Sequence, residues 1–150
     1  MSPELHQLLL RTDVRGAWEH PPGANWPYEI SRVRKLMPEL ESVLQAQLSL
    51  DEGVQDASFF ADLGVLVQQT DPNGIIHLCY SICFRFSWFG NLVSLYGEDS
   101  GEYNATGAVR VLEEHGFTYV PAAELGELYD GINPPYEPTL TWWVRYFDYL

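Results

Sequence analysis

Basic residues are scarce in this 150-residue chain, and long apolar runs are missing. Eight lysines and arginines stand against 21 aspartates and glutamates, which gives a formal net charge of −13. A field of this sign repels phosphate backbones and anionic lipids, so we expect neither nucleic acid nor a membrane as a partner. No apolar run approaches the roughly 20 residues that cross a bilayer. The charge favours a basic partner, or serves only to keep the protein dissolved.

Cysteine is nearly absent. The chain has two, Cys79 and Cys83, inside IIHLCYSICFRF, which is typical of one extended strand. Four residues of strand separate the two Cα atoms by about 13 Å, beyond the roughly 7 Å limit for a disulfide. Unpaired thiols suit a reducing compartment. The first residues, MSPELHQLLLRTD, carry acids where a secretory leader is basic. We therefore expect a cytoplasmic protein.

Sequence motifs typical of catalytic or metal-binding sites are also missing. The four histidines lie in four segments, no HExxH or CxxC occurs, and GEDSG lacks the pattern of a serine-hydrolase elbow. We expect no metal, no cofactor and no catalytic residue. One alternative is a loose metal constellation of His77 and the two cysteines. Another is a general acid in the loop that holds Glu98, Asp99 and Glu102, where repulsion between like charges raises a pKa.

The rest of the composition is typical of one α+β domain spanning residues 1–150. The chain is 46% hydrophobic and 14% aromatic. Ser2 and Pro3 begin a predicted helix that ends near Leu10. Apolar residues at three-and-four spacing predict a second helix from Tyr28 to Leu48, kinked or restarted at Pro38. Further helices are predicted at 105–115 and, after a proline, at 122–129.

The middle of the chain changes to a period of two, which predicts strands. FFADLGVLVQ and IIHLCYSICFRFSW alternate apolar and polar residues on either side of TDPNG, a hairpin turn. Gly90 and Asn91 mark a second turn before LVSLY. Residues 58–96 are therefore predicted to form a three-stranded antiparallel meander.

The last residues, TLTWWVRYFDYL, alternate in the same way. We predict that they form a fourth strand, which gives an antiparallel sheet of about four strands packed against N-terminal and C-terminal helices. The even positions would face the core. Trp143, Phe147 and Tyr149 would lie on the opposite face, which is either covered by helix or exposed as an aromatic patch.

In size, acidic balance, helix-then-meander order and aromatic terminal segment WWVRYFDY, the chain resembles small immunity proteins of bacterial polymorphic-toxin systems. The resemblance implies a one-domain cytoplasmic protein that neutralises a toxin by covering its active site. We therefore expect a non-enzymatic protein that binds a basic protein. Acidic side chains would steer association and aromatic ones would anchor it. The residues expected at the partner are Glu98, Asp99, Glu102, Tyr103, Glu113, Glu114, Trp143 and Phe147.

Two other classes of function fit the sequence. One is a small-molecule site or hydrolase between the sheet and the helices, with a pocket lined by Tyr80, Phe84, Trp88 and Trp142. The other is a homo-oligomer that associates through the odd face of the terminal strand.

Overall fold

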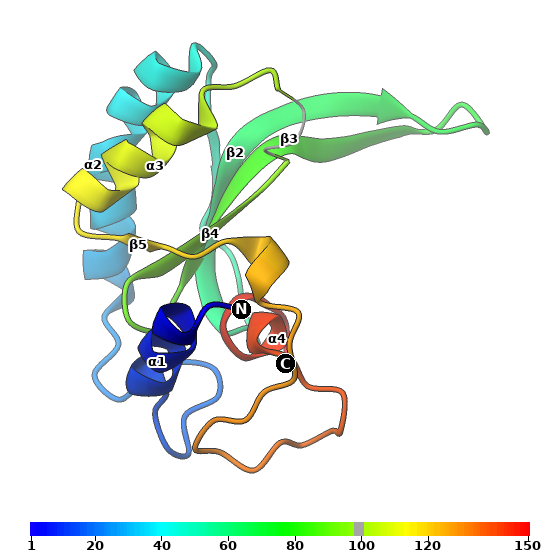
Figure 1. Cartoon of the computed structure of the whole chain (residues 1–150). Coiled ribbons are helices and arrows are strands. Elements are labelled where there is room, and N and C mark those ends of the chain that lie inside the picture. Colours follow the sequence, from blue (N-terminus) through cyan, green and yellow to red (C-terminus); the bar gives the residue numbers. More distant parts are fainter. Residues whose placement is uncertain (98–100) are drawn as a thin grey trace.

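The computed structural model describes residues 1–97 and 101–150 and has an α+β fold, as the sequence predicts (Figure 1). Its described strands form one sheet in the order β1-β2-β3-β4-β5. In the part of the chain that the structure describes, no helix is long and apolar enough to cross a membrane. The elements are α1 (Pro3–Thr12), α2 (Trp26–Leu44), β1 (Ser49–Asp51), β2 (Phe59–Thr70), β3 (Ile76–Ser87), β4 (Leu92–Tyr96), α3 (Ala105–Glu114), β5 (Thr118–Tyr119), the 3-10 turn η2 (Ala122–Glu124) and α4 (Trp142–Phe147).

The predicted meander is confirmed. β2, β3 and β4 pair antiparallel in sequence order, with Leu63 opposite Phe84 and Phe84 opposite Leu95. Two short strands extend the sheet: β1 pairs antiparallel with β2, and β5 pairs parallel with β4. They have three and two residues. Strands of this length are too short for an alternating pattern to show, so neither is among the strands predicted for the sheet.

Helices α2 and α3 cover one face of the sheet. Their buried side chains, among them Leu36, Leu40 and Leu112, pack in one cluster with Phe84 and Phe86 of β3. Asn25 caps the start of α2, and the helix continues through Pro38 without restarting before it ends at Gln45, which is left-handed. Packing against the sheet offsets the hydrogen bond that proline removes, because most helical stability in proteins comes from an apolar face.

Helices α1 and α4 and the loops near them form a second cluster, at the lower end of the molecule in Figure 1. Leu9 of α1 and Trp142 and Tyr146 of α4 are fully buried there. The turn η2 stands where a longer helix was predicted at 122–129, and it ends at Glu124, with Leu125 as its C-cap before Gly126. Glycine disfavours a helix because ordering its backbone costs the most entropy.

The predicted terminal strand is wrong, because residues Trp142–Phe147 form a helix. The hydroxyl of Thr141 caps it by accepting a hydrogen bond from the Val144 N–H at 3.4 Å. Apolar residues occupy nearly every position of this stretch, so the alternation that indicates a strand coexists with pairs at four-residue spacing. The structure uses the second pattern: the ring of Trp142 stacks on Tyr146, and Trp143 stacks on Phe147.

Candidate functional site

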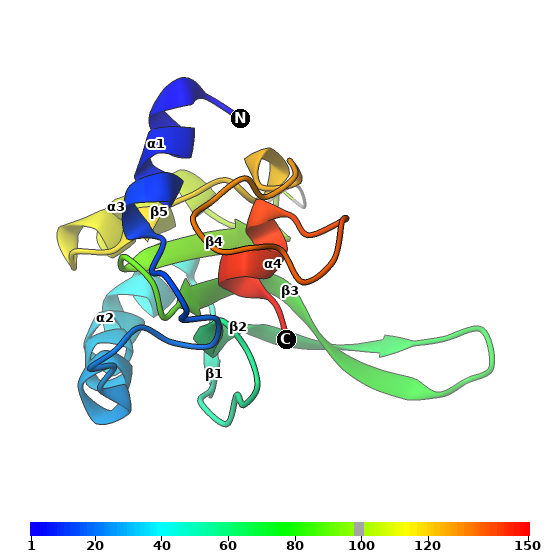
Figure 2. The same ribbon diagram turned by 90° about the horizontal axis from the view of Figure 1, so that it is seen from below.

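The hairpin of β2 and β3 extends well beyond the strands that flank it, as Figure 1 shows at the upper right. β1 pairs with β2 only at residues 62–64, and β4 pairs with β3 only at residues 83–86. We call residues 65–82 the hairpin arm. Within the described residues, neither outer edge of the arm is paired with another strand. Figure 2 shows the same projection from below.

One face of the arm is apolar and open to solvent. Leu66 lies opposite Tyr80, Gln68 opposite Leu78 and Thr70 opposite Ile76, so these side chains share a face. Leu66, Ile76 and Leu78 are 41%, 63% and 67% exposed. We call Leu66, Ile76, Leu78 and Tyr80 the arm face. A group of exposed apolar side chains on one face marks a site of interaction in many proteins.

The tip of the arm is held by Asp71. Its carboxylate accepts hydrogen bonds from the backbone N–H groups of Asn73 and Ile75, both at 2.9 Å, and lies 3.2 Å from His77 Nε2. The bond from Ile75, followed by that from His77, lowers the pKa of Asp71 below its usual range. This turn orders the tip before any partner arrives, which reduces the entropy that binding would cost.

The base of the arm is fixed by the packing of Tyr80 on Gly64. A Cβ atom at Gly64 would stand 2.7 Å from a ring carbon of Tyr80 and 2.3 Å from the carbonyl oxygen of Ile82, so only glycine fits. A β-bulge between Val65 and Leu66 bends the hairpin at this point. Partial burial raises the pKa of Tyr80 to about 12. The arm thus begins in a tightly packed joint.

Closer to the body, an ion pair closes the same face of the sheet. Arg85 donates to both carboxylate oxygens of Asp62 at 2.9 and 2.8 Å and to the Phe147 carbonyl at 2.9 Å. Its guanidinium lies 3.9 Å from the ring centre of Phe59. Arg85 therefore joins α4 to the sheet. The neighbouring Cys83 is buried, and burial raises the pKa of its thiol. The face of the sheet opposite α2 and α3 is therefore covered by α4 at this point and open to solvent along the arm.

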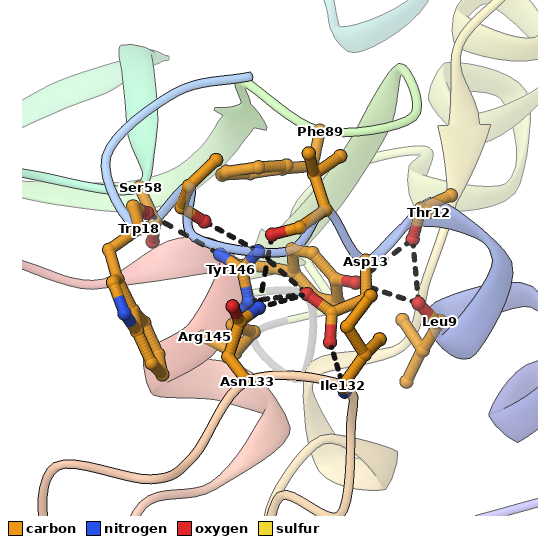
Figure 3. A network of polar contacts seen from close by, with 12 residues as sticks. Leu9, Thr12, Asp13, Trp18, Ser58, Phe89, Ile132, Asn133, Arg145 and Tyr146 are labelled. Atoms are coloured by element: carbon orange, nitrogen blue, oxygen red, sulfur yellow. Dashed lines mark hydrogen bonds and ion pairs between the residues drawn. The ribbon is translucent and has the colours of Figure 1, made fainter. Parts of the chain in front are cut away.

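A second buried ion pair ties the two ends of the chain together (Figure 3). The Asp13 carboxylate accepts hydrogen bonds from Arg145 at 2.7 and 2.9 Å and from the Asn133 amide at 3.1 Å, and the Tyr129 hydroxyl also donates to it. The guanidinium lies 4.2 Å from the ring centre of Phe89. Both charged side chains are fully buried. This network positions α4 and offers no surface to a ligand.

The sequence-predicted site residues do not form one surface. Glu98 and Asp99 lie outside the described residues. Glu102 is exposed, and the Tyr103 hydroxyl lies 2.8 Å from Ser81 Oγ at the base of the arm. Phe147 is buried and Trp143 is half-buried, because the helical turn directs the Phe147 ring inward. Glu113 and Glu114 are exposed on α3, which Figure 1 places on the other side of the molecule from the tip of the arm.

The sequence reasoning missed the arm face. Two signals were present: β2 and β3 have 12 residues each, about twice the usual strand length, and β4, which pairs with β3, has only five. Two long strands beside a short one leave ends without neighbours. Apolar residues next to the TDPNG turn then have no core to enter.

The pocket expected for a small molecule does not assemble from its four predicted side chains. Phe84 is buried in the cluster beneath α2 and α3, whereas Trp142 is buried in the cluster around α1 and α4. Within residues 1–97 and 101–150, no group of His, Cys, Asp or Glu side chains is placed to hold a metal ion. Cys79 and Cys83 are unpaired.

Comparisons of the chain with protein-family models, with curated proteins and with solved structures found no match. The arm and the charge of the chain are the features that bear on its function.

Proposed function

We propose that this chain is a non-enzymatic protein-binding domain whose arm face contacts the partner. One observation carries the proposal: Leu66, Ile76 and Leu78 are held 41% to 67% exposed on one face of an ordered hairpin. Contact with another polypeptide would remove these apolar side chains from water, which contributes favourable free energy to binding. Covering them contributes about 1 to 2 kcal/mol each, part of the roughly 1.5 to 3 kcal/mol for complete burial of such a side chain.

The charge of the chain supports a basic partner. A net charge of −13 raises the rate of encounter with a basic protein and disfavours an acidic one. Exposed carboxylates such as Glu113 and Glu114 contribute to this field at a distance even though they lie away from the arm. The resemblance to immunity proteins supports a toxin as the basic partner, and the two unpaired thiols support a cytoplasmic location.

A capture experiment with matched variants tests the proposal. The wild type, an Ile76→Ser/Leu78→Ser variant and a Leu128→Ser control are immobilised and exposed to lysate of the native host. Leu128 is a suitable control because it is 63% exposed, close to the 67% of Leu78, and lies outside the arm. The proteins bound to each are identified, and the purified partner is then titrated at two salt concentrations.

We expect the wild type and the Leu128→Ser control to retain a basic protein that the arm variant loses. Its affinity should fall as salt rises, because salt screens attraction between opposite charges. Equal retention by all three proteins would remove the arm face from the function. An acidic partner whose affinity does not depend on salt would contradict the role given to the charge.

A further inference from the structure

We propose that two copies of this chain associate through their arms, with the outer edges of the two β2 strands pairing antiparallel at residues 66–70. The arm face then stays available to the partner of the proposed function, because edge-to-edge pairing uses backbone groups and leaves both faces of the hairpin uncovered. The inference goes beyond the proposed function and does not depend on it.

The edge of β2 is accessible along the arm. β1 ends its pairing at Gly64, opposite Ser49. Beyond that point lies an open hollow lined by Gln47, Leu48, Ser49, Val65 and Leu66. An added strand would therefore enter alongside Leu66 in line with β1, where the described chain leaves room for it. Alternate residues of an edge strand direct their N–H and C=O groups outward, which provides donors and acceptors for such a strand.

The edge of β3 is less accessible at the base of the arm. A Cβ atom at Gly97 would stand 2.0 Å from the carbonyl oxygen of Ser81, so the backbone at Gly97 lies directly against β3. Tyr103 also contacts Ser81 through its hydroxyl. Among the residues that the structure describes, the edge of β2 is thus the longer of the two that remain open.

Beyond the bulge at Val65 and Leu66, the exposed edge carries no charged residue and no proline that would keep another strand away. Folded proteins protect edge strands with charged residues, with proline or with a very short strand. The five residues of the edge, LVQQT, contain no charge, no proline and no glycine. Val67 and Thr70 are β-branched and favour extended backbone. An edge of this composition is expected to be covered by another strand when the protein is at its working concentration.

A second copy fits this edge, because the arm brings almost no carboxylates together when two copies meet. Two chains of net charge −13 repel each other least through a surface of this kind. Residues 65–82 contain one carboxylate, that of Asp71, which pairs with His77 at the tip. Pairing of one edge with the same edge of a second copy is two-fold symmetric and closed, so it forms a dimer and not a filament.

The symmetry axis passes through Gln68, which lies opposite Gln68 of the second copy, and Leu66 lies opposite Thr70. The two Gln68 side-chain amides are neutral donors and acceptors that can bond to one another. A five-residue strand pair is small for an interface, so we expect a dissociation constant in the range of roughly 10 to 100 µM.

Sedimentation equilibrium of the whole protein tests the dimer. The proteins are the wild type, Gln68→Lys, Gln68→Glu, an equimolar mixture of these two variants, and a Gln7→Lys control. Gln68 and Gln7 are both exposed, so neither change should disturb folding, and Gln7 lies on α1 away from the arm. Each variant of Gln68 places like charges opposite each other at the axis.

We expect the wild type and Gln7→Lys to form a dimer that strengthens as salt rises, because salt screens repulsion between two acidic copies. Gln68→Lys and Gln68→Glu alone should each dimerise about tenfold more weakly, a cost of the size expected for opposed like charges. Their mixture should recover the dimer, because Lys then faces Glu.

A wild type that stays monomeric up to about 500 µM at both salt concentrations would overturn the proposal. A dimer that neither Gln68 variant weakens, or that the mixture fails to restore, would overturn it as well. Failure of the proposed function would show in the capture experiment instead, as partner binding that Ile76→Ser/Leu78→Ser does not weaken.

Discussion

Replacement of Arg145 by methionine should destabilise the fold strongly. Methionine keeps most of the length of the side chain and removes the guanidinium, which leaves the fully buried Asp13 carboxylate without its cation. Removing one member of a buried pair costs about 3 to 5 kcal/mol, because the other charge remains away from water. The whole stability of a domain is only about 5 to 15 kcal/mol. Arg145→Met therefore removes a large share of it.

Urea unfolding followed by tryptophan fluorescence measures this effect. With a denaturant slope of about 2 kcal/mol per molar, the midpoint should fall by about 2 M urea. Arg34→Met is the control: it removes the pair of Arg34 with Glu52, whose side chains are 55% and 36% exposed. Such a surface pair contributes about 1 kcal/mol or less. If the two variants unfold at similar urea concentrations, the network around Asp13 does not hold the fold together.

Three further outcomes follow from particular contacts. Burial raises the pKa of Tyr80 from 10.0 to about 12, so between these pH values the folded state holds a proton that the unfolded state releases. The free energy of unfolding should therefore fall as pH rises from 10 to about 12. In denaturant melts, Tyr80→Phe should make this fall shallower. Gly97→Ala should destabilise the fold more than Gly74→Ala, because both glycines have positive φ but only Gly97 lies against neighbouring backbone. Equal melting temperatures of the two variants in thermal melts would contradict this. A thiol reagent should modify Cys79 well before the buried Cys83, and two equally fast thiols would contradict the burial.

The α+β class and the meander could be predicted from the sequence because their signals are local. Alternation in β2 and β3 and the turn at Asp71 to Gly74 each depend on a few neighbouring residues. The α4 helix could not be predicted in this way, because Trp142–Phe147 satisfies both periods and tertiary packing decides between them.

The candidate site was hidden for a different reason. The alternation in β3 is the same in the core and in the arm, so Leu78 and Phe84 belong to one apolar series in the sequence, although Phe84 is buried and Leu78 is 67% exposed. What separates them is the length of the neighbouring strands. The pairing of Asp13 with Arg145 spans 132 positions, and no local pattern connects those two residues.

Hydrogen exchange of the protein, alone and with its purified partner, tests the central claim most directly. That claim is that the arm is the binding element. Partner binding should slow exchange of the backbone amides from Ile76 to Tyr80, which carry the arm face, and should leave the exposed turn of α3 at Glu113 and Glu114 unchanged. Slower exchange at α3 or at the terminal helix α4, with the amides of Ile76 to Tyr80 unaltered, would contradict the account.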